Sequence, residues 1–326
     1  MKVSAALPPG VSALFFSAAR QRRRLEAELT AGLESAGYSE VIVPILDYFE
    51  PYEALLSQEG RQELYRFIDR DGQQVALRGD FTPMLARLLA PQLPSLELPL
   101  RLFYRGDVVR YAEDRPGRQR ESYQLGAELL GVADGEGEEE ILRRCLDLLV
   151  AARVPGARVV LGVAGALDTL LEQAAPEVPE RDELAAAVAR RERDVARRAA
   201  PQLFEVVRDG KPADPEILGL RVAAEVERLE ALCRSIDREY PSIDVAIDLA
   251  EFARLSLAPD LAEAMRRRSY YDGLLFRAYS DSGALPLGSG GRYDRLFSSL
   301  GAELPAVGFS LSLDRVEAAA AQGGEG

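Results

Sequence analysis

Hydrophobic residues recur along this chain in two spacings, one typical of helices and one typical of strands. The first helix is predicted over residues 17–36, where apolar residues follow at helical spacing: Leu25, Leu29, Leu33 and Ala36. Gly37 comes next and is a residue that often ends a helix. Further helices are predicted over residues 82–89, 136–152 and 165–173, and a charge-rich helical stretch over 180–240.

Short apolar or β-branched runs predict the strands. A buried strand is expected at 41–45, with Pro44 limiting its pairing. The runs 64–68 and 74–77 flank Asp71-Gly72, which is a strong hairpin signal. Longer or later strands are predicted at 98–109, 122–130, 158–163, 243–249 and 273–279. Strands joined by hairpins, with helices between them, predict an α+β fold built on an antiparallel sheet.

Composition narrows the functional classes. The chain has 326 residues and a net charge of −13, which disfavours nucleic acid as a partner because phosphates are bound mainly by Lys and Arg. Cys145 and Cys233 form no metal-binding spacing, and no apolar run approaches the roughly 20 residues of a membrane span. No signal peptide is expected, so the predicted location is the cytoplasm, without membrane contact. Histidine is absent, so any chemistry would rest on carboxylates, arginines and tyrosines, and no metal or cofactor is expected.

The first candidate residues are Asp80 and Thr82, a carboxylate and a hydroxyl two residues apart at a predicted helix start. Helix capping is the alternative explanation for both. Further along, Gln124 and Glu128 share one face of a predicted strand, and Gly126 between them is expected to leave open space for a small polar ligand. Arg110 on the neighbouring strand could bind a carboxylate or phosphate, or could simply pair with Glu128.

The last quarter of the chain supplies the remaining candidates. Tyr271 places a phenol beside the predicted sheet, although a core tyrosine is the commoner meaning of such a residue. Gly290-Gly291 at a strand end is interpreted as a turn, although such a pair also permits close backbone approach. Tyr293 follows, and Arg315 lies on a final helix.

In this order, the segments resemble the ATP phosphoribosyltransferase regulatory subunits, catalytically silent relatives of histidyl-tRNA synthetase. The resemblance spans about 8–135 and 243–317. It rests on Leu-Arg-Gly-Asp-Phe-Thr-Pro (77–83), Tyr-Arg-Gly-Asp-Val-Val-Arg (104–110), Tyr-Gln-Leu-Gly-Ala-Glu (123–128), Tyr-Tyr-Asp-Gly (270–273) and Gly-Gly-Arg-Tyr-Asp (290–294). It implies a class II aminoacyl-tRNA synthetase-like core with an antiparallel sheet flanked by helices. One domain is expected at 1–317, with a mostly helical insertion at about 174–240. A tail follows at 318–326, and no anticodon-binding domain is expected. Residues 38–52 match the dimer-forming motif.

The resemblance also implies a pocket for free histidine. Asp80, Thr82 and Gln124 match the positions that hold the α-ammonium group. Glu128 and Tyr271 match those that bind the imidazole nitrogens, and Tyr293 matches a further pocket tyrosine.

The ATP-binding residues of the synthetase are only partly matched. Ser122 stands where the synthetase stacks an aromatic residue on adenine, and Tyr111 and Ala112 replace a histidine and a glutamate. One of three residues could be the match of the catalytic arginine: Arg266, Arg267 or Arg268. Arg110 and Arg315 match phosphate-binding arginines, so residual phosphate binding is left open.

The function implied is that of a non-catalytic subunit within a glycosyltransferase complex. It would be required by a short catalytic ATP phosphoribosyltransferase chain and would confer feedback inhibition by histidine at the first step of histidine biosynthesis. Self-dimers within a hetero-octamer are expected, and no tRNA partner. Two alternatives remain: a truncated histidyl-tRNA synthetase-like enzyme that forms histidyl-adenylate, and a scaffold whose pocket binds nothing.

Overall fold

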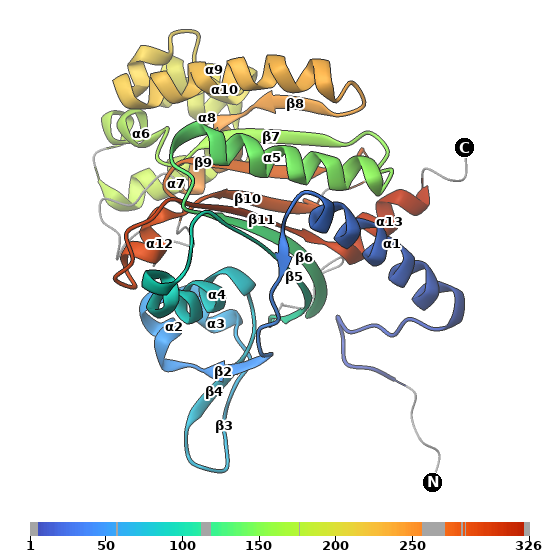
Figure 1. Cartoon of the computed structure of the whole chain (residues 1–326). Coiled ribbons are helices and arrows are strands. Elements are labelled where there is room, and N and C mark those ends of the chain that lie inside the picture. The colour runs from blue at the N-terminus through green and yellow to red at the C-terminus, as the bar shows by residue number, and fades with distance from the viewer. Residues whose placement is uncertain are drawn as a thin grey trace.

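The computed structural model describes residues 6–56, 58–111, 119–175, 177–255, 271–281, 283 and 285–322. Within these residues, one large mixed sheet runs through the molecule and a small sheet lies to one side of it (Figure 1). Among the described helices, none has both the length and the apolar character needed to cross a membrane.

The large sheet positions most of the polar side chains discussed below. Its order in the described residues is β1 (Ser39–Glu40), β5 (Leu100–Val109), β6 (Glu121–Leu130), β11 (Ala306–Ser312), β10 (Gly288–Arg292), β9 (Leu274–Tyr279), β7 (Arg158–Val163) and β8 (Asp244–Ile247). The inner strands pair antiparallel, as predicted, whereas the outermost pairs β1–β5 and β7–β8 are parallel.

The small sheet has the order β2 (Leu46–Tyr48), β4 (Gln74–Leu77) and β3 (Arg66–Ile68). Strands β3 and β4 form the hairpin predicted from Asp71-Gly72, and Gly72 has a positive φ of 80°. Helices α2 (Glu50–Leu55), α3 (Gln58–Glu63) and α4 (Phe81–Leu89) lie close to this sheet in Figure 1. A 3₁₀ helix, η1, spans Ala90–Ser95 after α4.

The strand predicted at 41–45 is not formed. Pairing with β5 covers only Ser39–Glu40, and Ile42 is 91% exposed. The guanidinium of Arg78 donates to the carbonyl oxygens of Val43 (2.8 Å) and Pro44 (3.0 Å), so a side chain satisfies the groups that a strand would have paired. Pro44 also has no N–H to contribute to a ladder.

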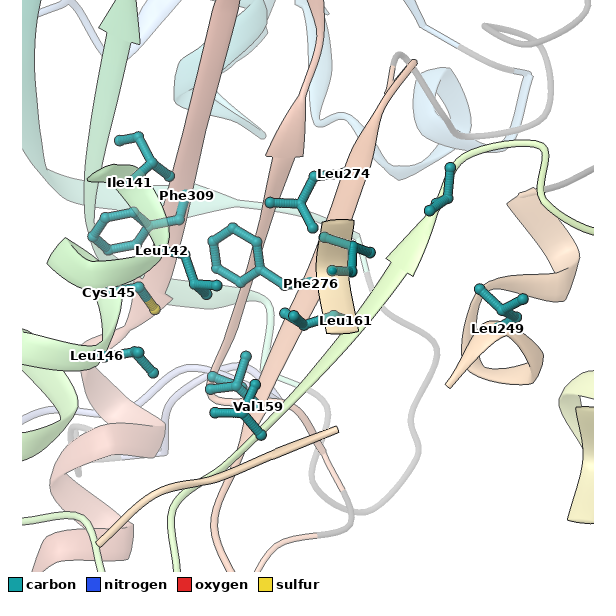
Figure 2. Packing of buried hydrophobic residues seen from close by; sticks show 14 of the residues in the cluster. Ile141, Leu142, Cys145, Leu146, Val159, Leu161, Leu249, Leu274, Phe276 and Phe309 are labelled. Carbon is teal, nitrogen blue, oxygen red and sulfur yellow. The ribbon is translucent and has the colours of Figure 1, made fainter. Parts of the chain in front are cut away.

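Helices pack on both faces of the large sheet. On one face, α1 (Phe16–Ser35), α5 (Asp134–Ala151), α10 (Leu220–Glu239) and α13 (Leu313–Gln322) enclose the main core. Figure 2 shows Ile141, Leu142 and Cys145 of α5 beside Phe276 and Phe309 of the sheet. Each large side chain fully buried in this way contributes roughly 1.5–3 kcal/mol to stability.

The segment 168–239 is mostly helical, as expected of the predicted insertion. It contains α6 (Asp168–Ala174), α7 (Val178–Ala189), α8 (Arg193–Ala199), α9 (Pro201–Asp209), η2 (Pro215–Leu218) and α10, and η3 (Leu249–Leu255) follows β8. Its buried residues join the core of the sheet in one continuous cluster. The domain division stays a prediction, and α13 runs across its boundary at 317/318.

The opposite face of the sheet carries a second, smaller cluster. Phe81 and Leu85 of α4 pack there against Tyr104 of β5 and against Phe297 of α12 (Asp294–Ser298). The alternation of a strand sends Leu125, Ala127 and Leu129 of β6 into the main core, so Gln124, Gly126 and Glu128 face this second side. The predicted polar residues therefore gather on the α4 side of the sheet.

Candidate functional site

A pocket of about 330 Å³ opens on the α4 side of the sheet. Seven of the eight predicted binding residues line it: Asp80, Thr82, Arg110, Gln124, Tyr271, Tyr293 and Arg315. The eighth, Glu128, lies directly behind Thr82 and Tyr293 and is bonded to both. The structure thus brings together residues that are up to 235 positions apart in the sequence. The segment holding Arg266, Arg267 and Arg268 lies outside the described residues.

The start of α4 positions two of these side chains. Asp80 has extended backbone angles and caps the helix, accepting a hydrogen bond from the Thr82 N–H at 3.2 Å. The capping explanation is therefore correct for Asp80, which nevertheless also lines the pocket. Thr82 instead directs its hydroxyl across to β6, where Oγ1 donates to Oε1 of Glu128 at 2.7 Å.

Glu128 is the deepest polar group of the site and is 1% exposed. Its carboxylate accepts hydrogen bonds from the hydroxyls of Thr82 and Tyr293. Burial raises the pKa of Glu128 from 4.5 to about 7, although both hydrogen bonds favour the carboxylate; the nearby charge of Asp80 raises the pKa further. Gly308, its partner across β11, makes room for the carboxyl group, because a Cβ there would overlap Oε2.

The expected open space above Gly126 is absent. Tyr104, opposite Gly126 in the β5–β6 register, covers the glycine so closely that a Cβ would overlap its hydroxyl. That Tyr104 would cover this position was not predicted from the sequence. Gly126 itself could have indicated this contact from the sequence, because a glycine inside a strand often marks the close approach of a neighbouring group.

Gln124 lines the pocket one strand repeat before Gly126. Its side-chain oxygen Oε1 is buried, and no donor reaches it from any residue that the structure describes. A buried acceptor without a donor is destabilising unless a ligand or water completes it.

Cationic side chains line the same pocket. Nη2 of Arg110 forms an ion pair with Oδ2 of Asp80 at 3.1 Å, and its Nε donates to the carbonyl of Gly79. The alternative pairing of Arg110 with Glu128 was therefore wrong. Nη1 of Arg315 donates to the carbonyl of Pro286 at 2.7 Å, and Arg120 adds a third guanidinium to the lining.

Gly290-Gly291 does not form the predicted turn. Both glycines lie within β10, between β9 and β11. A Cβ on Gly291 would stand 2.8 Å from the ring of Tyr271, so the missing side chain lets this tyrosine lie against the sheet. The glycine pair therefore shapes the pocket wall.

The residues that depart from the synthetase pattern also occupy defined places. The hydroxyl of Ser122 lies 3.0 Å from that of Ser312 on the neighbouring strand, and both line the pocket. Next to Ser122, Tyr123 of the matching motif faces the other side of the sheet, where its hydroxyl donates to Glu26 at 2.7 Å. Tyr111 is half-exposed and packs edge-on against Tyr65, with ring centroids 6.2 Å apart. Ala112 lies outside the described residues.

Comparison with known proteins shows which family this chain resembles in sequence and structure. The family model described as histidyl-tRNA synthetase matches residues 10–316. An ATP phosphoribosyltransferase regulatory subunit from Symbiobacterium thermophilum is 34% identical over 98% of this chain and 80% of that protein. A solved histidine–tRNA ligase subunit from Alicyclobacillus acidocaldarius is 26% identical, with all of both chains covered and a TM-score of 0.74.

A chain of the ATP phosphoribosyl transferase (HisG:HisZ) complex from Thermotoga maritima shares the fold. Its TM-score is 0.64 at 18% identity, and the match covers 90% of this chain and 97% of that one. The extent of these matches confirms the resemblance inferred from the motifs. The chain belongs to the histidyl-tRNA synthetase family and, within it, to the ATP phosphoribosyltransferase regulatory subunits.

Proposed function

We propose that this chain is the non-catalytic regulatory subunit of an ATP phosphoribosyltransferase. In this role it binds free histidine in the pocket on the α4 side of the sheet and pairs with a separate catalytic chain. The observation that carries the histidine assignment is one wall of the pocket, which presents hydrogen-bond acceptors to a ligand. We call this the acceptor wall and define it as Asp80, Thr82, Gln124 and Tyr293, with Glu128 behind them.

The hydrogen-bond directions explain why this wall accepts. A hydroxyl has one proton and two lone pairs. Thr82 and Tyr293 both direct that proton to Glu128, so neither hydroxyl has its proton left to donate to a ligand. Asp80 contributes a carboxylate, and Gln124 contributes a buried oxygen that lacks a donor within the described chain. Such a wall favours a ligand rich in N–H groups.

Free histidine has matching chemistry at each position. Its ammonium group offers three N–H donors, which suit Asp80, Thr82 and Gln124. By the family resemblance an imidazole N–H would reach Glu128, which in the unliganded structure lies behind Thr82 and Tyr293, and Tyr271 would be the partner for the second ring nitrogen. The carboxylate requires cations, and Arg110, Arg120 and Arg315 line the same pocket. Each charge-assisted bond formed away from water contributes about 1.5–3 kcal/mol.

Feedback inhibition requires only that histidine bind one state of the assembled complex more tightly than the other. A tenfold preference shifts the equilibrium by about 1.4 kcal/mol for each site. We therefore assign this chain to the first step of histidine biosynthesis as the histidine-sensing part of a glycosyltransferase complex, with no tRNA partner.

Reconstitution tests this assignment. The short catalytic subunit is assayed for turnover alone, with this chain, and with this chain plus L-histidine. Turnover should rise on addition of the chain and fall again with histidine. The variant Glu128→Ala should keep assembly and activation but lose the response to histidine. Glu139→Ala, a half-exposed glutamate on α5, is the matched control and should respond normally. Activation that does not depend on this chain would refute the regulatory role.

Self-association of the chain is part of the proposal. Large apolar side chains are exposed on and beside the small sheet: Ile42, Ile45, Leu46, Tyr48, Phe67 and Ile68. We call this set the small-sheet surface. Exposed apolar clusters mark interaction sites in soluble proteins. Part of this surface falls within residues 38–52, where the family resemblance places a dimer motif, so we propose dimers that assemble with catalytic chains into a hetero-octamer.

Histidyl-adenylate formation is the second candidate, because Arg110 and Arg315 line the same pocket as the acceptor wall and could hold a triphosphate. Ser122 weighs against it: a serine bonded to Ser312 provides no aromatic face for adenine. Histidine-dependent exchange of pyrophosphate into ATP would establish the enzyme. Calorimetry with L-histidine addresses the scaffold alternative, which predicts no heat of binding at millimolar concentration.

A further inference from the structure

Asp272 is a carboxylate that directly follows Tyr271 of the pocket but does not line the pocket itself. Its side chain is 8% exposed, and its ion pair with Nε of the exposed Arg295 side chain is long, at 3.9 Å. Burial raises the pKa of Asp272, so the charge is costly at this position. So weak an ion pair does not offset the burial of a carboxylate, and its other contacts require an explanation.

The carboxylate of Asp272 caps helix α12 from a distant part of the chain. Its Oδ1 accepts from the N–H of Asp294 at 3.3 Å, and its Oδ2 accepts from the N–H of Arg295 at 2.8 Å. These residues begin α12, and the first N–H groups of a helix have no partner within it. Tyr293 stands at the N-cap but makes no side-chain cap, because its hydroxyl donates to Glu128. Asp272 therefore supplies the cap that Tyr293 does not.

The same residue also joins Tyr271 to this segment through the backbone. The N–H of Asp272 donates to the carbonyl oxygen of Arg292 at 3.0 Å, immediately before Tyr293. The ring of Tyr271 lies in the space left by the missing side chain of Gly291. Asp272 is thus bonded to the residue before Tyr293 and to the two residues after it. It fixes the backbone on both sides of one pocket tyrosine while being the chain neighbour of the other.

The spacing of the two tyrosines matters for the proposed ligand. Both line the pocket, and Tyr293 holds the carboxylate of Glu128 in place. In the proposed complex, Glu128 binds one imidazole nitrogen and Tyr271 binds the other. An imidazole ring is rigid, so the two groups must be correctly spaced at the same time. Binding sites of this kind depend on the residues that support the contacting side chains.

We propose that Asp272 is a positioning residue for histidine recognition. It touches no ligand, but it sets the position of the Tyr271 hydroxyl relative to the Tyr293–Glu128 pair, and the imidazole ring is recognised between them. This inference rests on the proposed function of the pocket. A cap with a purely structural role would affect stability alone, whereas a positioning residue must act on binding through Tyr271.

The experiment compares Asp272→Ala with Asp214→Ala in the full chain. Asp214 is an exposed aspartate that also caps a short helix, η2, where it accepts from the N–H of Glu216 at 3.0 Å, and it does not line the pocket. L-histidine affinity is measured by calorimetry, and Tm is measured without ligand. Both variants should have a lower Tm. Asp272→Ala should bind L-histidine about tenfold more weakly, or about 1.4 kcal/mol, and Asp214→Ala should bind it as wild-type protein does.

A double-mutant cycle with Tyr271→Phe separates positioning from stability. Tyr271→Phe alone should weaken L-histidine binding. Adding Asp272→Ala to it should cost less than about a further threefold, because the hydroxyl that Asp272 positions is already gone. A further loss of the full tenfold would show that Asp272 acts independently of Tyr271 and would overturn the inference, as would wild-type affinity in Tyr271→Phe.

The remaining outcomes distinguish this inference from the proposed function. If wild-type protein binds L-histidine and Asp272→Ala binds it equally well, the inference is overturned while the proposed function stands. If wild-type protein binds no L-histidine, the proposed ligand and this inference fall together. If Asp272→Ala does not fold, Asp272→Asn decides, because it keeps one of the two acceptor oxygens in nearly the same shape. Its affinity should fall, and wild-type affinity would contradict the inference.

Discussion

Glu128 gives the sharpest test of the electrostatics of the site. Its carboxyl group is buried, and its pKa is raised from 4.5 to about 7. The variant Glu128→Gln keeps nearly the same shape and an acceptor oxygen for Thr82, but it cannot ionise. Comparing the two proteins across pH therefore isolates the energy of burying this single charge.

The number of protons bound by the folded and unfolded states determines whether stability rises or falls with pH. Between pH 4.5 and about 7 the folded protein retains a proton on Glu128 that the unfolded chain releases. Stability falls with rising pH wherever the folded state binds more protons. A rise in pKa from 4.5 to about 7 corresponds to roughly 3 kcal/mol, at about 1.36 kcal/mol for each pKa unit. This stabilisation of wild-type protein is present in full below pH 4.5 and is lost as the pH rises through 7.

The assay is urea unfolding of both proteins at several pH values from 5 to 8, with the denaturant slope checked for constancy. The free energy of unfolding of Glu128→Gln relative to wild-type protein should rise by roughly 2.5 kcal/mol between pH 5 and 8, because part of the effect lies below pH 5. Glu139→Gln serves as the control, because Glu139 is 46% exposed and should leave the profile unchanged. Parallel profiles for wild-type protein and Glu128→Gln would refute the argument. They would mean that the carboxyl group is ionised, and fully compensated, throughout the range.

Three further predictions concern other parts of the molecule. Gly126→Ala forces a methyl group against the hydroxyl end of Tyr104 and the backbone carbonyl of Phe309, so the free energy of unfolding in urea should fall by about 1–3 kcal/mol. No change would show that both groups can move aside. Glu138→Ala removes the buried carboxylate that pairs with Nε of Arg292 at 2.8 Å. The stability measured by thermal unfolding should fall by about 3–5 kcal/mol, and a loss below about 1 kcal/mol would contradict the assigned ion pair. Ile42→Asp places a charge on the small-sheet surface, so the dimer should weaken in sedimentation experiments. The free energy of unfolding should change by less than about 0.5 kcal/mol. An unchanged dimer would exclude this surface as the dimer interface.

Much of the fold could be predicted because local signals agreed with tertiary packing. The Asp71-Gly72 pair predicted its hairpin, and the apolar run at 158–163 matches β7 residue for residue. The exception at 41–45 has a specific cause. Its residues favour a strand, but the carbonyls of Val43 and Pro44 are taken by Arg78, which is more than thirty positions away. Single-sequence periodicity contains no information about such a long-range donor.

The site was predictable where it depends on strand alternation and unpredictable where it depends on cross-strand register. Two-residue alternation correctly placed Gln124 and Glu128 on one face. How deeply each side chain is buried could not be predicted in this way, because burial depends on which residue of the neighbouring strand lies opposite. Gly308 admits the carboxyl group of Glu128 into the wall, and Gly126 is covered by Tyr104. Neither pairing can be derived from the spacing of residues within one strand.

The pocket has two parts, the acceptor wall and the region around Ser122 and Ser312. Their separation explains how amino-acid recognition could persist without ATP chemistry. The acceptor wall depends on the Glu128 network on α4 and β6, which does not involve Ser122. By the family resemblance, the synthetase stacks an aromatic residue on adenine at the position of Ser122, where this chain has a hydroxyl pair with Ser312. Stacking of a base on an aromatic side chain contributes about 1–3 kcal/mol. If the pocket binds histidine as we propose, the lack of that face would lower ATP affinity by roughly one to two orders of magnitude and leave the acceptor wall unchanged. In this proposal, histidine sensing requires only the acceptor wall, whereas adenylate formation would also require a site for the adenine base.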